Sequence, residues 1–80
     1  MKKIIIPKDP KQIGMLVRRC RTALYENQTD FGRRFNVQAA AVSKWEKGKV
    51  VPALSILIQA VDLLTAKEKA IARRYNALKR

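Results

Sequence analysis

The 80-residue sequence contains no histidine and a single cysteine, Cys20. These absences exclude histidine-based acid–base catalysis, metal sites built from histidine and cysteine, and a disulfide bond within the chain. Acidic residues are also few, because six Asp and Glu stand against 18 Lys and Arg. The scattered carboxylates offer no acid–base pair, and the three glycines form no phosphate-cradling loop. The sequence therefore predicts no enzyme, no metal site and no cofactor.

Long apolar runs are missing as well. No stretch approaches the roughly 18 residues that a membrane-spanning helix requires. Near the N-terminus, Pro7, Lys8 and Asp9 end the apolar run of residues 4–6 far short of a signal peptide. We therefore expect a cytoplasmic, nucleoid-associated protein with no membrane partner, and the sequence indicates no small-molecule ligand.

The excess of positive charge is the strongest signal in the composition. A formal net charge of +12 favours a polyanionic partner, either nucleic acid or an anionic membrane surface. The length suits one small domain, and an apolar fraction of 48% is sufficient for a helical core.

Apolar residues recur at three- and four-residue spacing through most of the chain, which predicts an all-α bundle of about five helices. The predicted helices cover residues 9–25, 28–35, 38–47, 53–64 and 65–80, after a short basic arm of residues 1–8. Asp9 and Asn27 are the predicted N-caps of the first two helices, and Gly48 is predicted to end the third. The capping box from Thr65 to Glu68 predicts the start of the fifth.

The apolar stripes of these helices form the predicted core. Cys20 lies in the first stripe and is interpreted as a core residue. The predicted stripe of the fourth helix consists of Leu54, Leu57, Ile58, Val61 and Leu64. A second apolar face of that helix, with Ile56, Ala60 and Leu63, would need a cover, either the fifth helix or a second subunit.

Residues 27–52 hold two short helical patterns joined by a turn. Phe31 and Phe35 lie four apart on one face of the first. Asn36 tolerates the left-handed conformation of a sharp turn. Val42 and Trp45 anchor the second pattern, whose outer residues are small, polar or basic. Two short helical patterns joined by a tight turn in this way predict a helix-turn-helix motif.

This stretch resembles the Cro/CI (lambda-repressor-like, XRE-type) helix-turn-helix family, and the resemblance covers roughly residues 11–64. The matching positions are Gln28, Phe31, Gly32, Asn36, Val37, Val42, Trp45, Glu46, Lys47 and Gly48, followed by Pro52. The resemblance implies a lambda-repressor-like DNA-binding domain over residues 9–64. Residues 65–80 would then be a basic helix that packs on the domain or at a dimer interface.

The resemblance also implies roles for single residues. Gln28 would clamp the DNA backbone and brace the third helix, and Arg21 would form a structural ion pair with Glu46. The apolar pattern itself assigns Trp45, Val42 and Phe31 to the core, because Trp45 shares a face with Val42 and Phe31 lies on the apolar face of the preceding helix.

The third helix would lie in the major groove and carry the base-reading candidates Gln38, Ala39, Ala40, Ser43 and Lys44. Gln38 can bond adenine, the alanines suit thymine methyl groups, and Lys44 could reach a guanine or a phosphate. Ala41 could instead turn inward. Readout by so alanine-rich a helix is sparse, so DNA shape or the arm with Lys2 and Lys3 could supplement it.

The candidates for phosphate contacts are Gln28, Arg18, Arg33, Lys47 and Lys49. Lys47 and Lys49 flank Gly48 in a loop and would carry no sequence information. Arg18 and Arg19 are either solvated or turned toward phosphate. The residues of the arm could pair as a strand, cross a dimer interface, pack on the core or remain disordered.

Together these features predict a sequence-specific, double-stranded DNA-binding transcriptional regulator. We expect a Cro-like repressor of bacterial or phage origin that binds a near-palindromic operator as a homodimer. The alternative is an antitoxin or adaptor that uses the same fold mainly to bind a protein partner.

Overall fold

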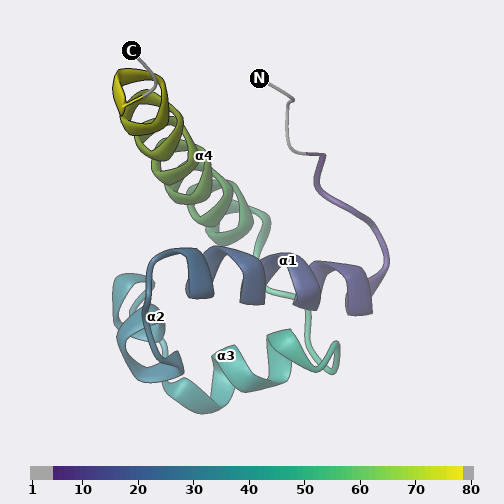
Figure 1. The fold of residues 1–80 in the computed structure, drawn as a ribbon. Helices are drawn as coiled ribbons and strands as arrows, with labels where there is room; N and C mark the ends of the chain where they lie inside the picture. Colours follow the sequence, from purple (N-terminus) through teal and green to yellow (C-terminus); the bar gives the residue numbers. More distant parts are fainter. Residues whose placement is uncertain (1–4, 79–80) are drawn as a thin grey trace.

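The computed structural model describes residues 5–78, with only the backbone described at Leu78. Within that range the chain forms four helices and no strand: α1 (Pro10–Ala23), α2 (Gln28–Arg34), α3 (Ala39–Glu46) and α4 (Leu54–Leu78). α1 lies between α3 on one side and α4 on the other (Figure 1). The predicted all-α class is confirmed.

The N-terminal ends of α1 and α2 are fixed by local hydrogen bonds. The side chain of Asp9 accepts from the N–H of Gln12 at 3.1 Å, and that of Asn27 accepts from the N–H of Asp30 at 2.8 Å. Each carboxylate or amide oxygen satisfies a backbone donor that has no partner within its helix. The predicted N-caps of these two helices are confirmed.

The connection from α2 to α3 is a tight turn. Asn36 adopts the left-handed conformation, with φ of 57°, as its residue type suggests. The N–H of Val37 then donates to the carbonyl of Gly32 at 2.9 Å. α3 starts two residues later, so its direction relative to α2 is set within a few residues.

The core lies between α1 and its two neighbours, α3 and the first half of α4, and α2 packs against α3. Phe31, Val42 and Cys20 are completely buried, and Trp45 is 5% exposed. The rings of Phe31 and Phe35 meet edge to face with centroids 5.1 Å apart. The remaining buried apolar side chains are Ile13, Leu16, Val17, Leu57, Ala60 and Leu64.

Gly14 brings α1 into direct contact with the end of α3. A β-carbon at this position would lie 2.5 Å from the carbonyl oxygen of Trp45 and 2.6 Å from that of Glu46. Both obstacles are backbone atoms, which a rotamer change cannot move away. Glycine is therefore required for this close approach.

The predicted fifth helix is wrong, because α4 continues from Leu54 to Leu78 without a break. No glycine or proline lies in this stretch to stop the helix. A capping box stabilises a helix start only when the first N–H groups lack partners. Inside a continuous helix, the N–H groups of Thr65 and Glu68 bond to the preceding turn instead.

The predicted core stripe of α4 is partly wrong. Leu57, Ala60 and Leu64 face α1 and are 2–3% exposed, whereas Leu54 and Ile58 are 63% and 47% exposed. The buried residues follow the three- and four-residue spacing of one helical face, and Leu54 and Ile58 lie to one side of that face. Since no separate fifth helix folds back over residues 54–64, that possible cover for the apolar strip is excluded.

The outer part of α4, residues 69–77, extends beyond the other helices and every side chain in it is exposed (Figure 1). Just before it, two contacts tie α4 to the body of the domain. Arg19 and Glu68 form an ion pair at 3.2 Å, and the Lys67 ammonium lies 5.4 Å from the centre of the Tyr25 ring. Although α4 is long, none of the four helices in the described range is apolar enough to span a bilayer.

The arm is described only in part. Ile6 packs against the core and Ile5 is 84% exposed. The predictions for Lys2, Lys3 and Ile4 lie outside the described residues, as do those for residues 79–80.

The buried thiol of Cys20 predicts a pH-dependent loss of stability. Burial raises its pKa from the ordinary 9.0 to about 11. The unfolded chain releases this proton at about pH 9, so the stabilisation is complete below that pH and is lost as the pH rises to about 11. We expect the free energy of unfolding to fall by on the order of 2–3 kcal/mol across this window, relative to Cys20→Ala. Urea denaturation of both proteins measures it, and identical pH profiles would contradict the prediction.

Candidate functional site

The outward side of α3 is small, polar and basic. Gln38, Ala40 and Lys44 are exposed, whereas Ala39 and Ser43 are half-buried. The side chain of Gln38 makes no capping hydrogen bond at the start of α3, so its amide is left available to a partner. Three of the five base-reading candidates thus share one exposed surface, which we call the α3 face (Gln38, Ala40 and Lys44).

The inward side of α3 is held by packing. Val42 and Trp45 are buried, and Phe31 of α2 is completely enclosed in the same cluster. Ala41 is half-buried and packs against this cluster, so it does turn inward. This packing fixes the rotation of α3 about its own axis and hence which residues it exposes.

A partly buried ion pair connects α1 to the end of α3. The Arg21 guanidinium donates to both carboxylate oxygens of Glu46, at 2.6 and 3.0 Å, and to the carbonyl oxygen of Glu26 at 3.0 Å. Only 15% of the Arg21 side chain and 8% of the Glu46 side chain are exposed. The hydrogen bonds to Glu46 raise the pKa of Arg21. The ion pair that the resemblance implied is present.

Gln28 joins this network from the start of α2. Its amide nitrogen donates to Glu46 Oε1 at 3.4 Å, and its side chain is half-buried. The network therefore links α1, α2 and α3 through one carboxylate. Bracing of α3 by Gln28 agrees with this geometry, while its contact with a phosphate stays a prediction.

The other phosphate candidates are exposed but do not form one cluster. Lys47 and Lys49 lie in the loop that follows α3, next to the α3 face. Arg33 is on α2, with 77% of its side chain exposed and 4.0 Å from Asp30. Arg18 is on α1 and is exposed.

Two basic residues have partners that their sequence spacing did not indicate. Arg34 donates from two nitrogens to the Glu26 carboxylate, at 2.8 Å each. These hydrogen bonds raise the pKa of Arg34. Arg19 pairs with Glu68, which is 49 residues away in the sequence. The first pairing joins α2 to the loop before it and the second joins α1 to α4, so neither could be derived from the periodicity of one helix.

A hollow beside α3 was also missed by the sequence reasoning. It has a volume of about 400 Å³ and opens next to the α3 face. We call it the α3 hollow; its lining residues are Gln38, Ala40, Ala41, Lys44, Trp45 and Val50. One wall is the loop after α3, which returns toward the helix, and no sequence signal predicts the position of that loop.

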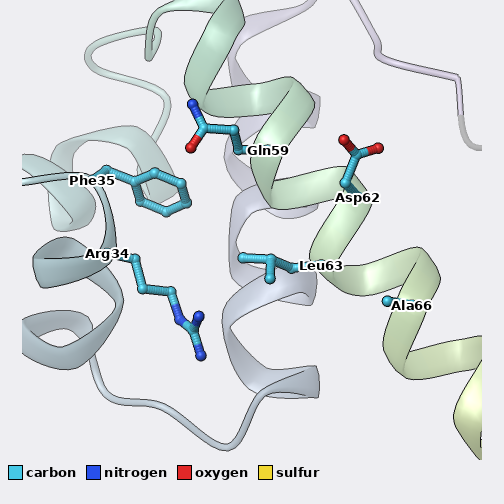
Figure 2. A pocket seen from close by; sticks show the side chains of 6 residues that line it. All are labelled: Arg34, Phe35, Gln59, Asp62, Leu63 and Ala66. Atoms are coloured by element: carbon cyan, nitrogen blue, oxygen red, sulfur yellow. The ribbon is translucent and has the colours of Figure 1, made fainter.

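A second pocket lies between the end of α2 and α4 (Figure 2). Its volume is about 390 Å³, and its lining residues are Arg34, Phe35, Gln59, Asp62, Leu63 and Ala66. Phe35 and Leu63 contribute apolar surface between the exposed polar groups of Gln59 and Asp62. Since Arg34 is already paired with Glu26, this pocket has no uncompensated charge that would select an anion.

Comparison with protein-family models, with curated proteins and with solved structures gives no match to this chain.

Proposed function

We propose that the protein is a sequence-specific double-stranded DNA-binding transcriptional regulator. In this proposal α2 and α3 form a helix-turn-helix of the lambda-repressor-like kind, and α3 enters the major groove. The main support for this proposal is the α3 face. Its small and hydrogen-bonding side chains are exposed, while the opposite side of the same helix is buried in the core. Base edges are read by such side chains when a rigid framework presents them.

Local electrostatics support the same partner. In residues 31–52 the single carboxylate is that of Glu46, and it is partly buried and paired with Arg21. The basic residues of this stretch are Arg33, Arg34, Lys44, Lys47 and Lys49. An approaching phosphate meets the exposed Lys44, Lys47 and Lys49, whereas Arg33 and Arg34 already have carboxylate partners in Asp30 and Glu26.

The proposed mode of action is that of a Cro-like repressor. A homodimer would place two α3 helices in successive major grooves, about 34 Å apart, on a near-palindromic operator. Most of the affinity would come from neutralised phosphates, so binding should weaken steeply as salt rises.

Selection of duplexes from a random pool, at low and at moderate salt, tests this function. We expect enrichment of a two-fold symmetric site with half-sites about ten base pairs apart. Binding without enrichment at either salt concentration would contradict the proposal.

Substitutions on the α3 face are expected to weaken DNA binding without unfolding the protein. Gln38→Ala should cost about 1–3 kcal/mol on the selected site and less on other sequences, because a lost base contact removes discrimination. Lys44→Ala should weaken binding as well. Titration of labelled duplexes measures both effects, and the melting temperatures should stay close to that of the unaltered protein.

Lys69→Ala is the matched control for Lys44→Ala. It removes one exposed lysine from the outer part of α4, which Figure 1 shows on the other side of α1 from α3. We expect Lys69→Ala to change affinity much less than Lys44→Ala. Equal losses for the two variants would mean that charge alone, and not the α3 face, governs binding.

The second candidate function is that of an antitoxin or adaptor that binds another protein. It is favoured by the outer part of α4, where Ile71 and Tyr75 are 55% and 60% exposed on one helical face. Co-purification with a stoichiometric partner that protects this face, together with no duplex enrichment, would select it over DNA binding.

A further inference from the structure

The α3 hollow has an apolar interior and a polar rim. Ala40, Ala41, Trp45 and Val50 contribute carbon surface to it. Lys44 and the Gln38 amide supply the polar groups of its lining. A small apolar group carried by an otherwise polar, anionic ligand therefore matches the hollow better than a wholly apolar ligand or a phosphate does.

The hollow is built before any ligand arrives. The N–H groups of Lys49 and Val50 both donate to the carbonyl oxygen of Lys44, at 3.0 and 3.4 Å. The N–H of Gly48 donates to the carbonyl of Trp45 at 3.1 Å. These bonds fold the loop back along α3 and hold Val50 in place, so little conformational entropy remains to be lost on binding.

Gly48 makes this loop path possible. Its φ of 76° lies in the left-handed region, which other residues rarely adopt. A β-carbon there would also lie 3.1 Å from the α-carbon of Lys11 on α1. The loop that carries Val50 therefore passes close to α1 at Gly48.

We propose that the α3 hollow is a seat for the C5-methyl group of a thymine, and that each half-site therefore favours an A·T pair at the base that faces it. This inference rests on the proposed function. Thymine is the only DNA base that presents a methyl group in the major groove. The hollow adjoins the α3 face, and the lysines at positions 44, 47 and 49 lie on the elements that form it and would meet the phosphates of the same strand. A volume of about 400 Å³ leaves room for part of the sugar beside the methyl group.

The test is a uracil scan of the selected duplex, in which each thymine in turn is replaced by deoxyuridine. This change removes a single methyl group and leaves the hydrogen-bonding edge intact. We expect one thymine in each half-site to lose about fourfold in affinity, which is the effect of burying one methyl-sized group. The scan with the unaltered protein shows whether any thymine methyl group is bound, and this result does not depend on the folding of a variant.

Two neighbouring valines provide matched variants for assigning the effect to the hollow. Val50 and Val51 are both 48% exposed, but only Val50 lines the hollow. In Val50→Ser, replacing the same thymine with deoxyuridine should reduce the affinity by less than about 1.5-fold. In Val51→Ser the loss of about fourfold should persist.

The possible outcomes separate the two proposals. Enrichment of an operator in which no thymine responds to loss of its methyl group would overturn the thymine seat while leaving DNA recognition intact. A methyl effect of equal size in Val50→Ser and Val51→Ser would also overturn it, because the contact would then lie elsewhere. Failure to enrich any duplex would refute DNA recognition itself, and the seat with it.

Discussion

Glu46→Ala is expected to destabilise the fold by about 3–5 kcal/mol, which is a large part of the stability of so small a domain. The Arg21 side chain is only 15% exposed, and Glu46 accepts two of its hydrogen bonds. Removal of the carboxylate leaves that guanidinium buried without a counter-charge. The amide of Gln28 loses its acceptor at the same time.

Urea denaturation followed by circular dichroism measures this loss. Glu68→Ala is the matched control, because Glu68 also pairs with an arginine, but with side-chain exposures of 43% for Glu68 and 55% for Arg19. A solvated pair of this kind contributes about 1 kcal/mol or less. Similar destabilisation in the two variants would show that burial of the Arg21–Glu46 pair is not what makes it important.

Trp45→Ala is expected to cost about 3–5 kcal/mol, because it leaves a large cavity between α3 and the rest of the core. Trp45 is 5% exposed and belongs to the same cluster as Val42 and Leu16. Trp45→Phe fills more of the space and should cost less than the alanine change. A part of the wall of the α3 hollow would also be lost in Trp45→Ala.

Thermal unfolding followed by circular dichroism is the measurement for the Trp45 variants, since Trp45 is the only tryptophan and fluorescence would disappear with it. Ile71→Ala serves as the control, because Ile71 is a large apolar residue that is 55% exposed on the outer part of α4. Its melting temperature should change by much less. A Trp45→Ala protein as stable as Ile71→Ala would contradict the assignment of Trp45 to the core.

The features that the sequence predicted well are those that neighbouring residues decide. Asp9 and Asn27 cap helices through atoms three residues away, and Asn36 turns the chain through its own backbone conformation. The pair of Arg21 and Glu46 is not local in this sense. It was expected because of the resemblance to a family, and periodicity alone gave no reason to join two residues 25 apart.

The features that were missed depend on how elements meet in space. The capping box at Thr65 is the same whether or not a turn precedes it, so the sequence could not exclude a continuous α4. Whether Leu54 or Ala60 faces the core depends on where α1 lies against α4. For the candidate site, Gln38, Ala40 and Lys44 were three of five residues predicted with the help of the resemblance, and their exposure relative to Ala39 and Ser43 depends on how α3 packs. The hollow next to them exists because Val50 returns to the carbonyl of Lys44, a contact made by the backbone.

The missing side chain at Gly14 has a consequence for how recognition could diverge. α1 rests directly on the last carbonyl groups of α3, so the tilt of α3 against the domain is set by a residue on another helix. A methyl group at that position would push the two helices apart at one end. A descendant that tolerated this shift would present the same Gln38 and Lys44 at a new angle. Under the proposed function, its preference among DNA sequences would then change although none of the proposed contact residues had been substituted.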